Sequence, residues 1–569
     1  MKFSYKKIYI ILLLLILIQS KVLARDNKAL YTKENISNYL FGIISVKHDN
    51  NEAHKYLKKV QLLKNDHSTF NIQFVRNLVL IEQFDEALTF SKSVWKEDEL
   101  FFEADLLLGL DYFKKGDYEN SEKYFERLNK ISAYNLHFYD FIGNVLVAWS
   151  KASQNNINQS FDIIEEIPKT YRHLKKIQKV FLKCYFDMDD TEIFFKEIIH
   201  NEDYNFSRYN FFLANYLLFK NKEKKAVKII QDSRQNNHSN LLLEESEFFL
   251  KKRKSKKIKS FFNCKKPSHN LAEFFYVIAN LYASEESYRL SNFYLKISEF
   301  LNDNFLPNKA LLAENFYYQK KYNLSKKVYE EIKPIGPTYS WYASKSISSI
   351  LLKEKGKEFS VKNLEKEFNF IKNPNTTHYY QLANFYKENQ YYEKAVQYYS
   401  LALKKINYDH FLVPKILDRR GTSYERMGDW ENSEKDLIES LKLKPDQAHV
   451  MNYLAYSWID KGINLDKGLE MLIEANSIEG GDGYIVDSLG WAYFAKKDYV
   501  KAEKFLQRAV ELLPTDPIIN DHYGDNLWML KKHIQARHVW TSILKLKATQ
   551  PKLKEEIEKK LIFGITNKI

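Results

Sequence analysis

The stretch GYIVDSLGWAYFAKKDYVKAEKFLQRAVELLP, residues 483–514, contains two amphipathic segments separated by a short polar break at residues 496–498. Apolar and small residues recur in it at spacings of three, four and seven, as on one face of a helix. These residues are Leu489, Gly490, Tyr493, Ala502, Leu506 and Ala509. Pro514 ends the second segment, because proline lacks the amide proton that a helix needs. The stretch therefore predicts two helices folded back on each other, with Gly490 and Ala502 letting their axes approach closely.

The same pattern returns along the chain with a period of 34 or slightly more residues. Gly490 lies 34 residues before Gly524 and 35 residues after Ala455. Other residues that keep this spacing are Phe41, Val75, Gly109 and Gly143, then Ala279 and Ala313, then Ala383 and Gly421. A single hairpin of this size cannot bury its own apolar faces, so successive hairpins must stack. The period therefore predicts an all-α repeat array.

Residues 483–516 resemble the consensus of the tetratricopeptide-repeat (TPR) family, which is Trp-x2-Leu-Gly-x2-Tyr, then Ala-x3-Phe-x2-Ala, then Pro. The matching residues are Leu489, Gly490, Tyr493, Ala502, Ala509 and Pro514, with Val486 and Leu506 in the places of Trp and Phe. Further matches surround Gly109, Ala383 and Gly421, and half-matches lie at Ala53 and Ala226. The resemblance implies a right-handed α-solenoid of stacked helix-turn-helix repeats that mediates protein-protein interaction.

We divide the sequence into six segments by how closely each resembles the repeat consensus and by its charge and apolar pattern. They are residues 1–24 (signal peptide), 25–235 (N-terminal TPR and TPR-like repeats), 236–270 (basic, degenerate connecting segment), 271–375 (central TPR-like repeats), 376–547 (regular C-terminal TPR block) and 548–569 (basic C-terminal helix or tail). The degenerate stretches near 150–205, 235–270 and 335–375 fit either worn helical pairs or an unrelated helical insert. Residues 410–546 also resemble the C-terminal part of proteobacterial envelope TPR proteins, which implies a Gram-negative secreted protein.

The N-terminus has the pattern of a secretory signal, with Lys2, Lys6 and Lys7 before an uncharged run over residues 8–20. That run has 13 residues, fewer than the roughly 18 to 20 that cross a bilayer as a helix. We expect cleavage after Ala24 and a location in the periplasm of a Gram-negative bacterium. An uncleaved N-terminal helix that anchors the chain is the alternative.

The only two cysteines, Cys184 and Cys264, lie 80 residues apart. This count excludes a framework of several disulfides and a zinc site with paired cysteine ligands. We expect two buried free thiols, and a single bridge in an oxidising compartment is the alternative.

Three glycines surround Asp482 in GGDG, residues 480–483. A phosphate-binding loop would need Gly-Lys-Ser or Gly-Lys-Thr after them, and a nucleophile elbow would need Gly-x-Ser-x-Gly around Ser488; neither is present. We interpret Gly480 and Gly481 as a helix stop that tolerates positive φ, and Asp482 as the cap of the next helix.

The sequence contains no His-Glu-x-x-His, Cys-x-x-Cys, Walker or calcium-loop motif, and its 14 histidines lack metal-ligand spacing. We therefore expect a non-catalytic scaffold without a cofactor or a metal. The alternative is an enzyme that acts on an envelope polymer and has its site in a degenerate middle region. The two hypotheses differ in whether residues 150–270 and 335–375 continue the helical pairs or form a closed pocket.

A TPR solenoid is expected to bind a protein or an extended peptide on the concave wall formed by the first helix of each repeat. In the C-terminal block the residues predicted to face this groove are Lys415, Asp418, Thr422 and Glu425; His449, Asn452, Tyr456 and Ile459; Tyr484, Asp487, Trp491 and Phe494; and Ile518, Asp521, Asp525 and Trp528. Aromatic residues mixed with carboxylates favour a peptide groove. Trp491 and Trp528 fit packing between neighbouring hairpins equally well.

The chain has 87 basic and 73 acidic residues, a net charge of +14, and much of the excess lies in KKRKSKKIKSFFNCKK, residues 251–266. The proposed anionic-surface patch consists of Lys251, Lys252, Arg253, Lys254, Lys256, Lys257 and Lys259. This run is either a solvated loop or a tether to anionic lipid or an acidic envelope polymer, with Phe261 and Phe262 inserting beside the charge. A nucleic-acid partner is not expected, because a secretory signal precedes the run. A membrane-surface-tethered spacer is therefore a further alternative to the scaffold.

Overall fold

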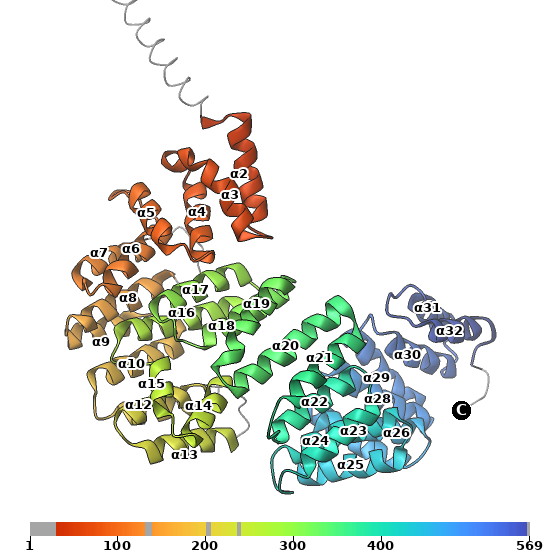
Figure 1. Cartoon of the computed structure of the whole chain (residues 1–569). Helices are drawn as coiled ribbons and strands as arrows, with labels where there is room; N and C mark the ends of the chain where they lie inside the picture. Colours follow the sequence, from red (N-terminus) through yellow and green to blue (C-terminus); the bar gives the residue numbers. More distant parts are fainter. Residues whose placement is uncertain (1–29, 131–138, 201–205, 236–239, 566–569) are drawn as a thin grey trace, which may run out of the picture. The chain divides into compact units, whose positions relative to one another are not determined.

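The computed structural model describes residues 30–130, 139–200, 206–235 and 240–565, so the expected signal peptide lies outside the described residues (Figure 1). Every regular element in the described ranges is a helix. The described elements form successive helical hairpins that pack on one another, which confirms the predicted all-α repeat array. The chain divides into two compact units, an N-terminal unit up to Glu354 and a C-terminal unit from Lys355.

The N-terminal unit consists of successive hairpins followed by one long helix. Its hairpins are α2 (Lys33–Ser45) with α3 (Asn50–Lys59), α4 (Ser68–Leu80) with α5 (Phe84–Val94), α6 (Phe102–Lys114) with α7 (Tyr118–Leu128), α8 (Tyr139–Ser153) with α9 (Ile157–Glu166), α10 (Arg172–Phe186) with α11 (Thr191–Ile199), α12 (Tyr209–Phe219) with α13 (Glu223–Gln235), α14 (Leu241–Lys251) with α15 (Ser255–Phe261), α16 (Pro267–Ser284) with α17 (Tyr288–Leu301), and α18 (Pro307–Tyr318) with α19 (Tyr322–Ile332). The long helix is α20 (Pro337–Lys355), and short 3-10 turns are η1 (Gln61–Asn65), η2 (Lys169–Tyr171) and η3 (Lys333–Ile335).

The C-terminal unit begins with a single helix, continues with five hairpins and ends on another single helix. These elements are α21 (Lys357–Asn369); α22 (Thr376–Glu388) with α23 (Tyr392–Leu403); α24 (Val413–Arg426) with α25 (Trp430–Leu443); α26 (Ala448–Asp460) with α27 (Leu465–Ile478); α28 (Gly483–Ala495) with α29 (Tyr499–Leu512); α30 (Pro517–Met529) with α31 (His533–Ile543); and α32 (Pro551–Phe563).

The degenerate stretches of the sequence also form helices. From α8 to α15 the chain continues as helical hairpins through the described parts of residues 139–261, and α20 and α21 occupy most of residues 335–375. The basic run is therefore not a loop, because it spans the end of α14, a turn and α15. Worn helical pairs and an unrelated helical insert both require helices, and the helices observed from α8 to α15 are paired as hairpins.

The turn inside each hairpin except α2–α3 uses a residue in the left-handed region. Gly116, Gly428 and Gly462 occupy this place in three hairpins, whereas Lys497 and Lys531 occupy it with φ of 65° and 62°. The turn closes when the next amide donates to a carbonyl five residues back, as Asp498 N–H does to Tyr493 O at 2.9 Å. The geometry of this turn is thus constant although glycine, the residue that adopts it most easily, is often absent.

The joint at residues 480–483 differs in part from its prediction. Neither Gly480 nor Gly481 has a positive φ, so the interpretation of a left-handed helix stop is wrong there. The capping role of Asp482 is confirmed, because its Oδ1 accepts from the backbone N–H groups of Tyr484 and Ile485 at 2.8 and 3.4 Å. The stretch connects two hairpins, and α28 begins at Gly483 directly after this cap.

In several repeats a glycine marks the point where the two helices of a hairpin touch. A Cβ atom at Gly490 would lie 2.7 Å from Leu506 Cγ and 3.0 Å from the backbone nitrogen of Leu506. At Gly109 the corresponding neighbour is the ring of Phe125, 2.4 Å from the same imagined atom. The predicted close approach of helix axes is therefore present, and only a side chain without Cβ fits these two positions without displacement.

In the N-terminal unit, hairpins that are distant in sequence pack against each other. Helix α17 lies against α4, and Lys296 Nζ forms an ion pair with Glu82 Oε1 at 2.6 Å. The rings of Phe84 and Phe300 stack with centroids 4.5 Å apart. These contacts join segments more than 200 residues apart, so the eighth hairpin closes onto the second.

Buried polar pairs fix the interior of the same unit. Arg208 binds Glu273 with two hydrogen bonds of 2.5 and 2.6 Å, and both side chains lie among aromatic rings. Glu245 of α14 accepts from the backbone N–H groups of Thr338 and Tyr339, at the start of α20. A carboxylate at a helix N-terminus compensates the free amides and the positive end of the helix dipole. Glu245 thereby determines where α20 begins.

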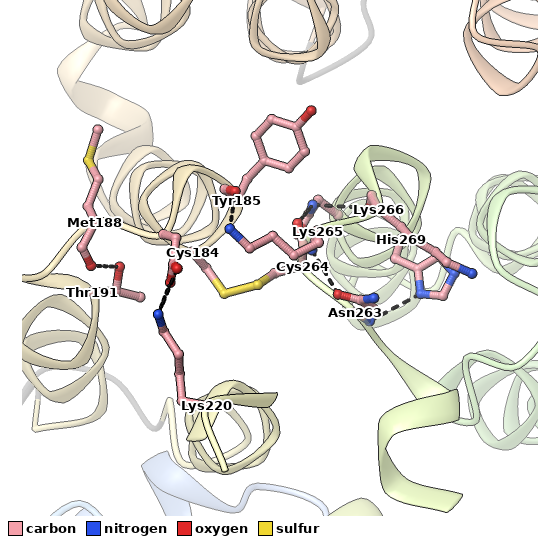
Figure 2. The surroundings of a disulfide bond; sticks show 12 residues. Cys184, Tyr185, Met188, Thr191, Lys220, Asn263, Cys264, Lys265, Lys266 and His269 are labelled. Carbon is pink, nitrogen blue, oxygen red and sulfur yellow. Dashed lines mark hydrogen bonds and ion pairs between the residues drawn. A yellow bond between two sulfur atoms is a disulfide. The ribbon is translucent and has the colours of Figure 1, made fainter. Parts of the chain in front are cut away.

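The two cysteines are bonded, so the expectation of free thiols is wrong and the alternative of a single bridge holds. Cys184 near the end of α10 and Cys264 just before α16 form a disulfide with Cα atoms 5.9 Å apart (Figure 2). Lys265 Nζ donates to Tyr185 O at 2.8 Å beside it, and Asn270 donates to Cys264 O at 2.8 Å. The separation of 80 residues hid the pairing in the sequence, because the two α-hairpins between them return the chain to α10.

Gly490→Ala is expected to destabilise the C-terminal unit by about 1–3 kcal/mol, because the added methyl group overpacks against Leu506. This loss outweighs the gain in helix propensity that alanine brings. Gly481→Ala is the matched control, since nothing lies within 4 Å of its Cβ position, and it should change stability by less than about 0.5 kcal/mol. Urea unfolding followed by circular dichroism measures both, and a Gly490→Ala variant as stable as the parent would contradict the packing.

The Cys184→Ser/Cys264→Ser double variant is expected to lose about 2–5 kcal/mol of stability, because the bridge closes a long loop in the unfolded chain. The unreduced parent, denatured in the presence of a thiol reagent, should show no reactive thiol, and the reduced parent should show two. Two reactive thiols in the protein isolated without reductant from its own cells would refute the bridge.

Candidate functional site

The predicted groove residues lie on α24, α26, α28 and α30, the first helices of four successive hairpins of the C-terminal unit. They separate into an accessible row and an internal set. In the row, the His449 side chain is 66% exposed, Tyr484 is 55% exposed and Ile518 is 47% exposed, while Lys415 is half-buried. One member per hairpin gives a line of side chains across the unit, and we call these four residues the outer row.

The carboxylates predicted for the groove belong to the internal set. Asp418, Asp487, Asp521 and Asp525 are all buried. Asp418 Oδ2 lies 3.6 Å from His449 Nε2, and a hydrogen bond to Asp418 raises the pKa of His449. Each of these carboxylates contacts a cationic or titratable group of the same chain. These carboxylates therefore interact mainly with groups of the protein itself.

Asp487 contacts a histidine that the sequence did not single out. His522 Nδ1 lies 2.9 Å from Asp487 Oδ2, and the ring of His522 stacks on that of Trp491 with centroids 4.1 Å apart. Burial alone would lower the pKa of His522, but Asp487, followed by Asp521 and Asp525, outweighs burial and raises it above its usual value. The imidazole ring lies between a carboxylate and an indole ring, and it joins α28 to α30.

Asp521 and Asp525 share one lysine from the C-terminal helix. Lys560 Nζ of α32 lies 2.7–2.9 Å from the oxygens of both carboxylates. Burial and the neighbouring Asp521 raise the pKa of Asp525 to about 6, against the opposing effect of Lys560. Helix α32 thus covers this end of the predicted groove, and its Lys560 binds both aspartates there.

The two tryptophans of the predicted groove both pack inside the protein. Trp491 lies between His522 and Phe494, whose ring centroids are 4.1 and 4.5 Å away. Trp528 stacks on His533 at 4.1 Å, and Gly564 lies so close that a Cβ there would be 2.0 Å from the Trp528 ring. Half-buried in these contacts, both rings join neighbouring elements, which favours the packing interpretation.

The remaining predicted residues lie between the outer row and the internal set. Thr422 is buried, and its hydroxyl donates to Arg419 O within the same helix. Burial, aided by Asp460, raises the pKa of Tyr456 to about 12. Asn452 is half-buried, and its Oδ1 has no hydrogen-bond partner. Asn452 therefore offers a buried acceptor that no donor among the described residues uses.

The basic run lies on the surface of α14 and α15. Lys251, Lys252, Arg253, Lys254, Lys256 and Lys257 are exposed, and Lys259 is half-buried with its Nζ 5.3 Å from the centroid of the Phe219 ring. Phe261 and Phe262 are buried in the core, so the expectation that they insert into a membrane is wrong. The patch can offer charge to an anionic surface, whereas these two rings stabilise the hairpin.

Within the ranges that the structure describes, no group of three or more His, Cys, Asp or Glu side chains is arranged to hold a metal ion. None of the helices in these ranges combines the length and the apolar character that a membrane span requires.

Comparison with known proteins finds the tetratricopeptide repeat at three places. Tetratricopeptide-repeat family models match residues 486–516, 106–135 and 379–404. A TPR repeat-containing protein of Pseudomonas aeruginosa is 28% identical over 143 residues. That match covers 25% of this chain and 23% of the relative, so it spans less than a quarter of the relative's length.

Solved structures give broader but more distant matches. The Cut9-Hcn1 assembly of the APC/C is 12% identical, with 94% of this chain and 98% of that chain covered and a TM-score of 0.37. YrrB, described as a TPR protein with an unusual peptide-binding site, is 17% identical over 30% of this chain and 86% of its own, with a TM-score of 0.25.

Asp487→Asn is expected to lower the pKa of His522, because the variant removes the negative charge that opposes the effect of burial on this pKa. A histidine whose folded pKa is raised adds stability that is complete below its unfolded pKa of about 6.5 and is lost as the pH rises through the folded pKa. The variant should therefore lose about 1–3 kcal/mol near pH 6 and less at high pH, where His522 is neutral in both proteins. Chemical denaturation at several pH values measures this difference.

Asp418→Asn is the matched control, since its partner His449 is largely exposed and the loss should stay below about 1 kcal/mol. The NMR resonance of the His522 ring, identified by its absence in His522→Gln, gives the pKa directly. A pKa of His522 at or below the usual value in the parent protein would contradict the effect assigned to Asp487.

Proposed function

Because the chain is a tetratricopeptide-repeat protein, we propose that it is a non-catalytic scaffold that binds an extended segment of another protein along the C-terminal unit. The observation that carries this proposal is the outer row, where His449, Tyr484 and Ile518 stay exposed beside a buried network of charges. Solenoids of this kind offer extended surfaces formed by one helix per repeat.

The chemistry of the outer row favours a mixed apolar and polar peptide. Tyr484 and Ile518 supply apolar area in adjacent hairpins, and His449 and Lys415 supply polar and basic groups in the two hairpins before them. Rigid aromatic anchors on a pre-organised surface are the usual sources of binding energy in such contacts. The ion pairs below the row supply that rigidity, because they join each first helix to its neighbours.

The same proposal places the protein in the periplasm of a Gram-negative bacterium, with a role in envelope assembly or export. The N-terminal sequence pattern supports secretion, and the buried bridge between Cys184 and Cys264 supports an oxidising compartment. The hairpins that continue through the described middle region favour the scaffold over an enzyme, since that region was the proposed location of a catalytic site.

The exposure of the basic run supports a second role, the attachment of the protein to an anionic surface. Six cationic side chains of α14, its turn and α15 face solvent, and each basic residue near an anionic surface contributes about 1 kcal/mol. This patch would hold the scaffold against lipid head groups or an acidic polymer by charge alone, because Phe261 and Phe262 are not available for insertion.

Site-specific photo-crosslinking in the native cells tests the scaffold. A crosslinker at Tyr484 or Ile518 should give an adduct with the same protein, whereas one at Val500, which is 73% exposed on the second helix α29, should not. The adduct should be lost in the double variant His449→Ala/Ile518→Asp when the crosslinker is at Tyr484. Equal adducts at Val500 would refute the outer row as the binding surface.

The location and the basic run are tested in the same cells. The purified chain should begin at Arg25 and should be recovered from the periplasm. Changing the lysines of residues 251–259 to glutamine should reduce membrane recovery without altering the Tyr484 adduct. Loss of the adduct in this variant would show that the patch is part of the partner site.

A further inference from the structure

Arg289 at the start of α17 is a half-buried guanidinium that has no carboxylate partner among the described residues. One terminal nitrogen donates to Gln73 Oε1 at 2.9 Å, and the buried Nε has no partner. Burial, with a smaller contribution from the neighbouring Arg76, lowers the pKa of Arg289 to about 10. The guanidinium group therefore remains protonated at neutral pH. A buried charge of this kind is costly unless an opposite charge meets it.

The surrounding groups leave the positive charge uncompensated. Arg76 is neutralised by Glu103, whose Oε1 lies 2.6 Å from Arg76 Nε. Lys321, directly before α19, is near enough to Arg289 that this guanidinium lowers the pKa of Lys321 in addition to burial, against the opposing effect of Asp49. Among the described residues no acid shifts the pKa of Arg289. The local balance is therefore a net positive charge in a partly enclosed place.

A small cavity lies next to this guanidinium. It has a volume of about 90 Å³ and is lined by Arg76, Leu80, Arg289, Leu290 and Phe293. Arg289 and Leu290 belong to the first turn of α17, the positive end of that helix, and the Ser287 side chain does not cap it. The two arginines and the start of α17 provide hydrogen-bond donors on one side of the cavity. The apolar side chains on the other side exclude water.

We propose that this cavity binds a compact oxyanion, the phosphate or carboxylate group of a small ligand, which the guanidinium group of Arg289 holds. Arginine presents parallel donors that match two oxygens of such a group. The bound anion lies between α4 and α17, where Lys296 and Glu82 already join the second and eighth hairpins. Binding therefore stabilises the closure of the N-terminal unit, and this role is independent of the outer row.

Calorimetric titration of the full chain with inorganic phosphate tests the site, with acetate as the carboxylate probe and chloride at matched ionic strength as the reference. Saturable binding of one oxyanion per chain is expected, together with a rise in the melting temperature of the N-terminal unit. Tighter binding of phosphate would assign the site to a phosphoryl group, and tighter binding of acetate would assign it to a carboxylate. No saturable binding of either probe would overturn the proposal.

Two variants locate the binding. Arg289→Gln should weaken it at least tenfold. Gln73→Glu places a carboxylate at the observed 2.9 Å from Arg289, so it should raise the melting temperature without added anion and also weaken binding at least tenfold. The second variant keeps the test decisive where Arg289→Gln fails to fold.

Arg508→Gln is the control, because Arg508 is an exposed surface residue of α29. Phosphate also stabilises proteins by exclusion from their surface, an effect that does not saturate and that all variants share. Binding that stays unchanged in both Arg289→Gln and Gln73→Glu would place the anion elsewhere and refute the site.

Discussion

The close approach of two helices at one small residue per repeat is the constraint on which the rest of the structure depends. At Gly490, Gly109 and Gly524 the second helix of the hairpin places Leu506, Phe125 or Trp540 where a Cβ would otherwise lie. The touching side chain varies in size, yet the hairpin stays closed in each case. Where this contact recurs, the two helices lie equally close, and neighbouring hairpins can stack into a solenoid.

Polar contacts then decide which hairpins meet at long range in the N-terminal unit. Apolar surfaces are weakly selective, because any of them gains by leaving water. The pairs Arg208–Glu273 and Lys296–Glu82, and the capping of α20 by Glu245, are selective, since the buried groups Glu273, Lys296 and Glu245 are costly to bury without a partner. The disulfide adds a covalent constraint of the same kind between α10 and the start of α16.

In the C-terminal unit the carboxylates of the first helices serve the protein itself. Asp418, Asp487 and Asp521 occupy equivalent places in three hairpins, and each contacts a different cationic group: His449, His522 and Lys560. These pairs join neighbouring helices and orient the outer row above them. The surface that remains for a partner is therefore less acidic than the composition of these helices suggests.

The sequence by itself determined the repeating hairpin, because the spacing of Leu489, Gly490, Tyr493 and Ala502 is a local property of two adjacent helices. It also determined the cap at Asp482 and the general position of the first-helix residues. The pairing of Cys184 with Cys264, the burial of Phe261 and the insertion of Lys560 between two aspartates were decided only by the tertiary structure. Those contacts join residues from different hairpins, and a helical period shows which face a residue occupies but not which distant side chain it meets.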